Sequence, residues 1–204
     1  RLLSSDIQLE SVVVSDVAED FNISSIEMST AKLDMSKVTE IPTFLGENDI
    51  IKAIQLLPGV SSVGEGASGF NVRGGSVGQN LVLLDEAPVY NSSHLLGFLS
   101  VFNPDAVKDL KLYKGGIPSR YGGRISSILD IRMKDGNKKN AVLSGGIGTI
   151  FSRLTLESPI VKDKSSFILA LRRSYADILA KPFLKNSNFF DDGAALNFYD
   201  LTAK

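Results

Sequence analysis

The sequence predicts an α+β domain, with a small mixed sheet and short helices, followed by a series of antiparallel β-strands. Helical spacing of apolar residues is confined to about the first 58 residues, and short alternating segments fill the chain from there to about residue 134. After residue 140 the alternating segments lengthen to about ten residues and show no helical spacing. We therefore expect a lead at 1–22, a compact domain at 23–137 and a strand-rich part at 138–204.

Composition sets broad limits on the class of protein. The chain has 204 residues, of which 43% are hydrophobic and 22% charged, so it can bury one sizeable core. Its 22 basic and 23 acidic residues balance, which argues for neither a nucleic-acid partner nor an anionic membrane surface. Cysteine is absent, which excludes disulfides and thiolate metal sites. No apolar run approaches the roughly 18 residues of a membrane helix.

Charge is unevenly distributed along the chain. Residues 1–49 hold three basic and ten acidic side chains, whereas residues 105–139 hold nine basic and four acidic ones. An acidic head and a basic middle indicate two different surroundings. The chain opens at Arg1 inside a patterned segment and stops at Lys204 inside an alternating one, so we expect it to be a piece of a larger protein.

The first third of the chain mixes short strands and helices. The segments "IQLESVVVS" (7–15) and "ISSIEMST" (23–30) are rich in residues that favour strands. Asp34 is the expected N-cap of a short helix that ends before Pro42. A second helix is expected at 47–57, where acidic residues favour the first turn. The apolar stripe of this second helix consists of Ile50, Ala53, Ile54 and Leu57.

The middle of the chain predicts short strands separated by turns. Residues 70–72 and "NLVLLD" (80–85) are expected to form strands on either side of a glycine turn. The segments "AVKDLKLYKG" (106–115) and "RISSILDIRMK" (124–134) alternate between apolar and polar residues, as half-buried strands do. The polar segment "DGNKKN" (135–140) is then a linker to the last part of the chain.

The last part alternates with a period of two residues. The pattern covers "FSRLTLES" (151–158), "SFILALRRSY" (166–175) and "LNFYDLTAK" (196–204). In the second segment Arg172 and Ser174 lie opposite the apolar residues, which are Phe167, Leu169 and Leu171. This dyad pattern is typical of a membrane β-barrel, but a soluble antiparallel sheet gives the same pattern. The pattern alone leaves both interpretations open.

The segment "GEGASG" (64–69) has the glycine spacing of a dinucleotide-binding fingerprint. That fingerprint works because a strand delivers the glycine turn and a helix follows, with its N-terminal N–H groups pointing at the pyrophosphate. Here the expected helix at 47–57 precedes the glycines and a strand follows them. We therefore expect the match to be a coincidence of spacing.

The segment "GGSVG" (74–78) resembles a hydrolase nucleophile elbow. Ser76, Asp85 and His94 follow in the chain order of an α/β-hydrolase triad, and His94 is the only histidine. The elbow needs a helix directly after the serine, whereas a strand is expected at 80–85. A Ser hydrolase is kept as a remote alternative, beside the simpler interpretation that His94 is a hydrogen-bonded loop residue.

A resemblance to a known family accounts for these glycines better. It rests on four motifs: "FNVRGG" (70–75), "LLDEAPVY" (83–90), "VKDLKLYKGGIPSRYGGR" (107–124) and "SSILDI" (126–131). In this order they resemble the plug region of TonB-dependent outer-membrane receptors, particularly the kind abundant in Bacteroidetes. The resemblance extends from about Gly46 to Asn137. It implies that the glycines serve tight turns with positive φ at the substrate-facing end of the plug.

The resemblance also implies roles for particular residues. The segment "ESVVVS" is similar to the TonB box, although its valines also suit a core strand. The residues of this segment are Glu10, Ser11, Val12, Val13, Val14 and Ser15. Arg73, Arg120 and Arg124 match plug arginines that pair with acidic residues of the barrel's inner wall. For Arg120 and Arg124 a solvated turn is the alternative. The expected substrate-facing loop residues are Glu65, Ser68, Gln79, Asn80, Tyr90, Asn91 and His94.

The family implies a barrel of about 22 strands around the plug, of which residues 138–204 supply only the first. These strands are expected at 141–149, 151–160, 165–176 and 195–204. The segment "VKDK" (161–164) would form a tight periplasmic turn. The polar segment 185–193 would belong to an extracellular loop, in which Phe189 and Phe190 either touch substrate or pack within the loop.

The function implied by the resemblance is energy-coupled import across the outer membrane of a Gram-negative bacterium. The plug gates the barrel, and a periplasm-spanning TonB-type protein pulls on the box after pairing with it as an added strand. No enzyme activity, cofactor or metal is implied. A siderophore, a glycan, a peptide or cobalamin is the expected substrate, and a surface lipoprotein is a further possible partner. The alternative is a ligand-binding or signalling module of the envelope that does not transport.

Overall fold

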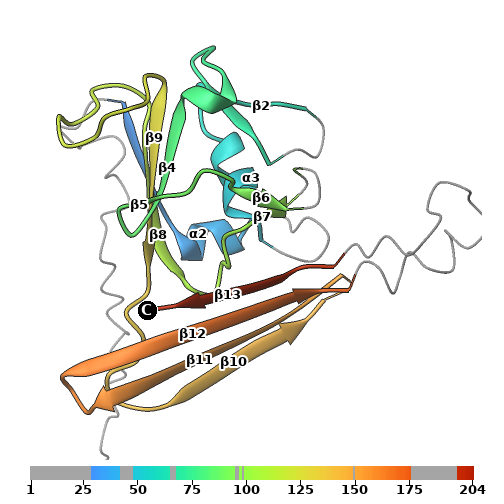
Figure 1. The fold of residues 1–204 in the computed structure, drawn as a ribbon, viewed down its shortest axis with the longest axis vertical. Coiled ribbons are helices and arrows are strands. Elements are labelled where there is room, and N and C mark those ends of the chain that lie inside the picture. Colours follow the sequence, from blue (N-terminus) through green and yellow to red (C-terminus); the bar gives the residue numbers. More distant parts are fainter. Residues whose placement is uncertain are drawn as a thin grey trace, which may run out of the picture.

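The computed structural model has two parts, an α+β domain and a four-stranded antiparallel sheet beside it (Figure 1). The residues it describes are 29–41, 48–64, 68–94, 97, 99–148, 150–175 and 197–204. Several sequence predictions lie outside these residues: the lead at 1–22 with the strand at 7–15 and the Glu10–Ser15 segment, Glu65, and the loop at 185–193. The predicted fold class is confirmed, because a mixed sheet with short helices precedes antiparallel strands.

The α+β domain is built on a five-stranded mixed sheet in the order β1-β8-β9-β4-β5. Its strands are β1 (Thr30–Asp34), β8 (Val107–Tyr113), β9 (Ser127–Met133), β4 (Asn80–Leu84) and β5 (Ala87–Pro88). The pair β4 and β9 is parallel and the other pairs are antiparallel. The alternating segments at 80–85, 106–115 and 124–134 are therefore strands as predicted, although the last begins only at Ser127.

Two short helices cover one face of this sheet, and both are shorter than the sequence predicted. Helix α2 spans Met35–Thr39 and helix α3 spans Ile50–Gln55. Asp49 caps α3, because its Oδ1 accepts hydrogen bonds from the amides of Ile51 (2.8 Å) and Lys52 (3.4 Å). Asp34 stands at the N-cap of α2 but makes no capping hydrogen bond with its side chain. The residues before it form β1, which begins at Thr30, and residues 23–28 of the strand expected at 23–30 lie outside the described residues.

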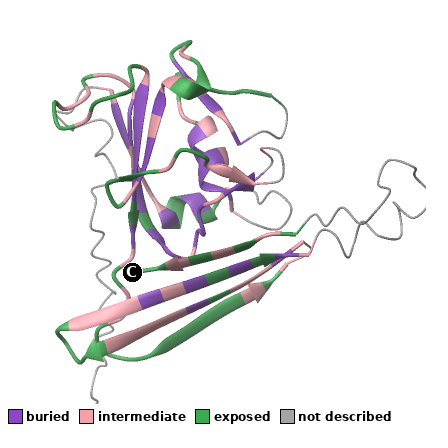
Figure 2. Cartoon of the chain, viewed as in Figure 1, coloured by how far each residue is buried: buried purple, intermediate pink, exposed green. Residues whose placement is uncertain are grey.

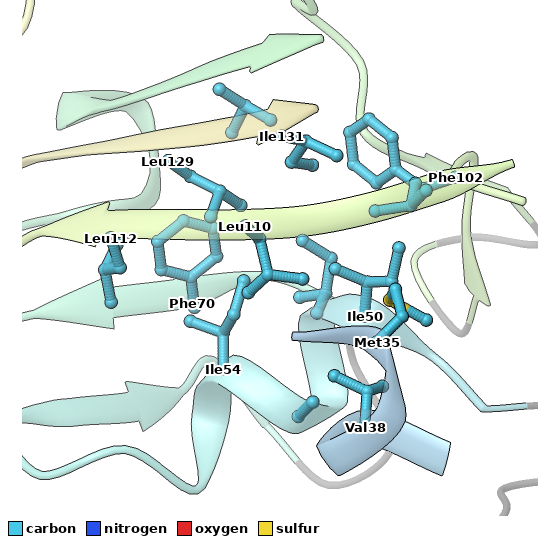
Figure 3. Packing of buried hydrophobic residues seen from close by; sticks show 14 of the residues in the cluster. Met35, Val38, Ile50, Ile54, Phe70, Phe102, Leu110, Leu112, Leu129 and Ile131 are labelled. Carbon is cyan, nitrogen blue, oxygen red and sulfur yellow. The ribbon is translucent and has the colours of Figure 1, made fainter. Parts of the chain in front are cut away.

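The main core lies between the two helices and the sheet (Figure 3). Leu110 and Leu112 on β8 and Leu129 and Ile131 on β9 are fully buried there. They pack in one cluster with residues of α2, α3 and β3, which include Val38, Ile50, Ile54 and Phe70. A smaller cluster of Leu83, Tyr113 and Ile128 lies apart from the main one. Burial of these apolar side chains is the main source of the domain's stability.

Two short strand pairs and one 3-10 helix complete the described part of the domain. Strands β2 (Val60–Ser62) and β3 (Phe70–Val72) form one antiparallel pair, and β6 (Ser93–His94) and β7 (Leu99–Ser100) form another. The 3-10 helix η1 (Val77–Gln79) leads directly into β4. No helix in the described stretches of the chain is long and apolar enough to cross a membrane.

The second part is an antiparallel sheet in the order β10-β11-β12-β13. Its strands are β10 (Val142–Ile147), β11 (Phe151–Val161), β12 (Ser165–Ser174) and β13 (Tyr199–Ala203). Each predicted strand is present, with bounds shifted by a few residues. The tight turn predicted at 161–164 is also present: the Lys164 amide donates to the Val161 carbonyl (3.0 Å), and Asp163 has φ +62°.

The two faces of this antiparallel sheet differ in polarity. Buried and more accessible residues alternate along β12 (Figure 2). Ile168, Ala170, Arg172 and Ser174 are buried and lie on the face toward the α+β domain. Ile168 and Ala170 pack against Ala106 and Met133 of the α+β domain. The register places the apolar residues together on the opposite face, where Leu154 lies across from Leu171, Leu156 from Leu169, and Leu171 from Leu201. This is the alternation that the sequence predicted.

Candidate functional site

The polar contacts between the two parts centre on Arg172, which lies on the inward face of β12. The residue is 3% exposed, and its guanidinium reaches into the α+β domain. Nη2 donates to the carbonyl oxygen of Ser100 at 2.6 Å, and Nη1 lies 3.5 Å from the carbonyl oxygen of Phe102. The guanidinium therefore binds the main-chain carbonyls of Ser100 in β7 and of Phe102 just after it. Because these acceptors belong to the main chain, substitution of the Ser100 or Phe102 side chain would leave them in place.

Asp200 neutralises this buried arginine. It stands directly opposite Arg172 on β13, and its Oδ2 accepts from Nε (2.9 Å) and from Nη2 (2.5 Å). Its other oxygen, Oδ1, lies 2.5 Å from Nε2 of His94 on β6. Phe198 stacks on the His94 ring with centroids 4.3 Å apart and also lies below the Arg172 guanidinium. A buried charge is tolerated only when it is paired and hydrogen-bonded, and this arrangement meets both conditions.

The same contacts extend to helix α3. The Ser100 amide donates to Oδ2 of Asp49 at 2.8 Å, while the Ser100 carbonyl accepts from Arg172. Asp49 uses its other oxygen to cap α3. A continuous set of hydrogen bonds thus connects the N-terminus of α3, strand β7, Arg172, Asp200 and His94.

Three further ion pairs hold the edges of this interface. Arg153 on β11 pairs with Asp105 (3.4 Å), and Lys204 pairs with Asp85 (3.1 Å) and Asp135 (3.0 Å). The hydrogen bond from Lys204 holds the pKa of Asp135 below its usual value. In these described contacts the antiparallel sheet supplies the cations and the α+β domain supplies the acids.

The predicted arginines Arg73, Arg120 and Arg124 lie elsewhere. All three are exposed, and they lie in loops at the ends of β3, β8 and β9 that point away from the antiparallel sheet (Figure 1). Arg73 donates to the Ser29 hydroxyl (2.7 Å) and lines a groove together with Lys114. Pairing of these arginines with other parts of a barrel wall stays a prediction.

Arg120 contacts two tyrosines of its own domain. Its guanidinium lies over the Tyr121 ring and 3.4 Å from the Tyr113 hydroxyl. Tyr121 in turn donates to Oδ2 of Asp130 at 3.0 Å. Burial, together with the Asp130 carboxylate, raises the pKa of Tyr121 to about 12. Because its guanidinium contacts two tyrosines, the Arg120 side chain is held in a more defined position than it would be in a solvated turn.

The predicted substrate-facing residues fall into two groups. Tyr90 and Asn91 are exposed, and Tyr90 is 87% accessible. Asn80 and Ser68 are buried, and Asn80 donates to the Phe70 carbonyl (2.6 Å) and accepts from Ser127 (2.8 Å). Gln79 is half-buried in the cap of η1, and His94 is engaged with Asp200. Of the described candidates, Tyr90 and Asn91 are the most accessible, and Glu65 lies outside the described residues.

The turn after β3 requires glycine at two positions, for two different reasons. Gly74 adopts φ +78°, which L-residues rarely adopt. Gly75 has no room for a side chain, because a Cβ there would collide with Ser126, whose hydroxyl donates to the Val72 carbonyl (2.8 Å). These two glycines therefore shape the tight turn between β3 and η1.

The three residues of the hydrolase alternative have separate partners. The Ser76 side chain caps η1, where it accepts from the Gln79 backbone. Asp85 accepts from the Met133 amide (2.9 Å) and pairs with Lys204, and His94 pairs with Asp200. In the hydrogen bonds that the structure describes, none of the three contacts another. This arrangement gives the hydrolase alternative no support.

Replacing Ser76 with alanine is therefore expected to cost at most about 1 kcal/mol of stability through the lost cap. Because the hydroxyl serves a structural hydrogen bond, neither the native chain nor S76A should cleave p-nitrophenyl esters. Ester hydrolysis by the native chain that disappears in S76A would contradict this expectation. Gly78→Ala, in which a Cβ meets open space, is a control for changes in the same turn.

The geometry defines a class of protein, namely an α+β domain docked on the polar face of an antiparallel sheet whose other face is apolar. Residues 22–127 match the model of the TonB-dependent Receptor Plug Domain family. The chain belongs to this family. Its place is therefore the outer membrane of a Gram-negative bacterium.

Several solved structures share the fold. The siderophore receptor PirA of Pseudomonas aeruginosa matches with a TM-score of 0.51 and 18% identity over 72% of this chain and 28% of that one. The ferric yersiniabactin uptake receptor FyuA of Yersinia pestis gives 0.51 and 17% identity over 73% and 24%. The chain thus spans about a quarter of the length of these receptors. A comparison with curated proteins finds no match.

From this point the α+β domain is called the plug, and β10 to β13 are called the wall sheet. Sequence reasoning placed Arg172 on the face opposite Phe167, Leu169 and Leu171 but assigned it no role. It also missed Asp49, Asp200 and the pairs made by Arg153 and Lys204. The available signal was a charged residue among the small residues Ala170 and Ser174 on the same face of its strand. A charge at such a position requires a partner.

Proposed function

We propose that the chain is the plug and the first wall strands of a receptor that imports a substrate across the outer membrane. The observation that supports this most directly is the polarity of the wall sheet. Its inward face carries the buried Arg172 and docks the plug, whereas its outward face carries aligned leucines suited to lipid. The domain bounds 1–22, 23–137 and 138–204 and the Bacteroidetes-type subclass are parts of the same proposal.

Energy coupling would begin at the Glu10–Ser15 segment. A TonB-type protein would pair with it as an added strand, since main-chain hydrogen bonds in register resist pulling and place few demands on side chains. The chain continues from this segment into β1, which lies at the edge of the plug sheet and pairs only with β8 among the described strands. Tension from the N-terminal side would therefore reach the plug at an edge strand.

A ferric siderophore is the first substrate class to test. Three of the structures that share the fold are described as receptors for a siderophore, ferric enterobactin or ferric yersiniabactin. Tyr90 and Asn91 are exposed on the plug and remain the candidates for substrate contact. A glycan or peptide substrate delivered with a surface lipoprotein is the alternative. The substrate would cross unchanged, so no catalytic residue is proposed.

The test is Val13→Pro in the full-length receptor. Proline removes a backbone N–H and fixes φ, so pairing with TonB should fail while substrate still binds. In cells that lack other siderophore receptors, iron uptake from catecholate, hydroxamate and carboxylate siderophores is expected to fall at least tenfold in V13P.

Val13→Thr, which keeps the amide and the β-branched shape, should retain uptake. Wild-type uptake by V13P would refute the box assignment. Failure of the unmodified receptor with all three siderophores would exclude that substrate class, and the same cells should then be tested with glycans and peptides.

A further inference from the structure

The hairpin formed by β6 and β7 is held in place by contacts with other parts of the protein, including the wall sheet. The hairpin has only two residue pairs, Ser93 with Ser100 and His94 with Leu99. A two-stranded ribbon this short is not stable by itself in water. Its two strands are instead held from both sides, by Asp49 of the plug and by Arg172 and Asp200 of the wall sheet.

The wall side supplies charge-assisted bonds on each strand of the hairpin. Arg172 donates to the Ser100 carbonyl on β7, and Asp200 binds the His94 ring on β6. The two wall residues are cross-strand neighbours and are bonded to each other. The wall thus binds the hairpin through one ion pair, Arg172 with Asp200, and the Arg172 side chain is nearly inaccessible to water.

An exposed polar stretch of the plug directly precedes the hairpin in sequence. Tyr90 and Asn91 precede β6 directly, and the Asn91 side chain accepts from the Ser93 amide (3.3 Å). The Val101 amide donates to the Ser92 carbonyl (3.1 Å), which ties this stretch to the segment after β7. The orientation of Tyr90 and Asn91 therefore depends on where the hairpin is fixed.

We propose that Arg172 and Asp200 form a latch that fixes the β6–β7 hairpin to the wall and thereby positions residues 90–94 for the substrate. The positioning role rests on the proposed import function, but the latch itself does not. Arg172 is a positioning residue, because it acts through the Ser100 and Phe102 carbonyls and the Asp200 carboxylate. Nothing in the latch requires Arg172 to touch the substrate.

Hydrogen exchange in the full-length receptor tests the latch without any substrate. In Arg172→Met, amide exchange of segment 99–103 is expected to be at least tenfold faster, while the plug strands β8 and β9 keep their protection. Arg172→Lys keeps the charge but offers a single donor nitrogen, so it should restore part of the protection. Arg173→Met is the matched control, because Arg173 is exposed on the other face of the same strand and should leave the hairpin unchanged.

Two results would overturn the latch: unchanged exchange of segment 99–103 in R172M, or equal acceleration in R172M and R173M. Faster exchange throughout β8 and β9 as well would show that Arg172 supports the whole fold and not the hairpin specifically, which also counts against the proposal.

Uptake kinetics with the same siderophore panel test the positioning role. R172M is expected to raise the half-saturating concentration at least threefold with a nearly unchanged maximal rate, and R172K should lie between R172M and wild type. An unchanged half-saturating concentration would overturn the positioning role. If the unmodified receptor imports none of the siderophores, the proposed substrate class fails, and the exchange measurement decides the latch by itself.

Discussion

Replacing Leu110 with alanine is expected to lower the free energy of unfolding of the plug by about 2–5 kcal/mol. Leu110 is fully buried on a central strand, where it packs toward α3 among Ile54 and Phe70 (Figure 3). Truncation removes buried methyl groups and leaves a cavity that the surrounding β8 and β9 backbone cannot close, because both strands are fixed in the sheet. Unfolding of the chain in urea, followed by far-ultraviolet circular dichroism, measures the loss.

Leu56→Ala is the matched control for this change. Leu56 belongs to the same domain and lies at the C-cap of α3, but its side chain is 68% exposed. Its truncation removes little buried area, so a change below about 0.5 kcal/mol is expected. Equal losses in L110A and L56A would mean that the helices do not pack on this face of the sheet.

The strands of the plug could be predicted because alternation is a local property. In "VKDLKLY" and "SILDIRM" the alternation predicts strands, and β8 and β9 follow these segments closely. The expectation that these strands are half-buried was wrong, because six of the seven residues of β9 are buried and both of its faces are covered. The helices were less predictable, because a five- or six-residue helix depends on packing more than on its own propensity. Leu33 illustrates the point, since it fits the apolar face of a helix but pairs with Leu110 in the sheet.

The contacts between plug and wall could not be predicted, because they join residues far apart in sequence. The family resemblance implied plug arginines that pair with acidic residues of the wall, whereas the described contacts put the cations Arg153, Arg172 and Lys204 on the wall sheet. Alternation correctly placed Arg172 on the face opposite Leu169 and Leu171. It carried no information about Asp200, which lies one strand further along, or about the Ser100 carbonyl 72 residues away. Such partners depend on strand register and docking, which single-sequence patterns do not encode.

The largest expected effect concerns the isolated chain of residues 1–204 in buffer without detergent. The outward face of its wall sheet carries Leu143, Leu154, Leu171 and Leu201, whose side chains are between 42% and 66% exposed. The strands at both edges, β10 and β13, also have no further partner in the described sheet. Apolar area next to unpaired edges drives association.

We therefore expect chain 1–204 to elute as oligomers in size-exclusion chromatography and to become monomeric in detergent. The paired change Leu154→Lys with Leu171→Lys places two like charges directly opposite each other on that face and should reduce association at least tenfold. Leu56→Lys, which adds a charge at an exposed site of the plug, should not. A detergent-free wild-type monomer that resists limited proteolysis over residues 140–204 would identify the wall sheet as a soluble sheet, and the proposed lipid-facing role of its leucines would be wrong.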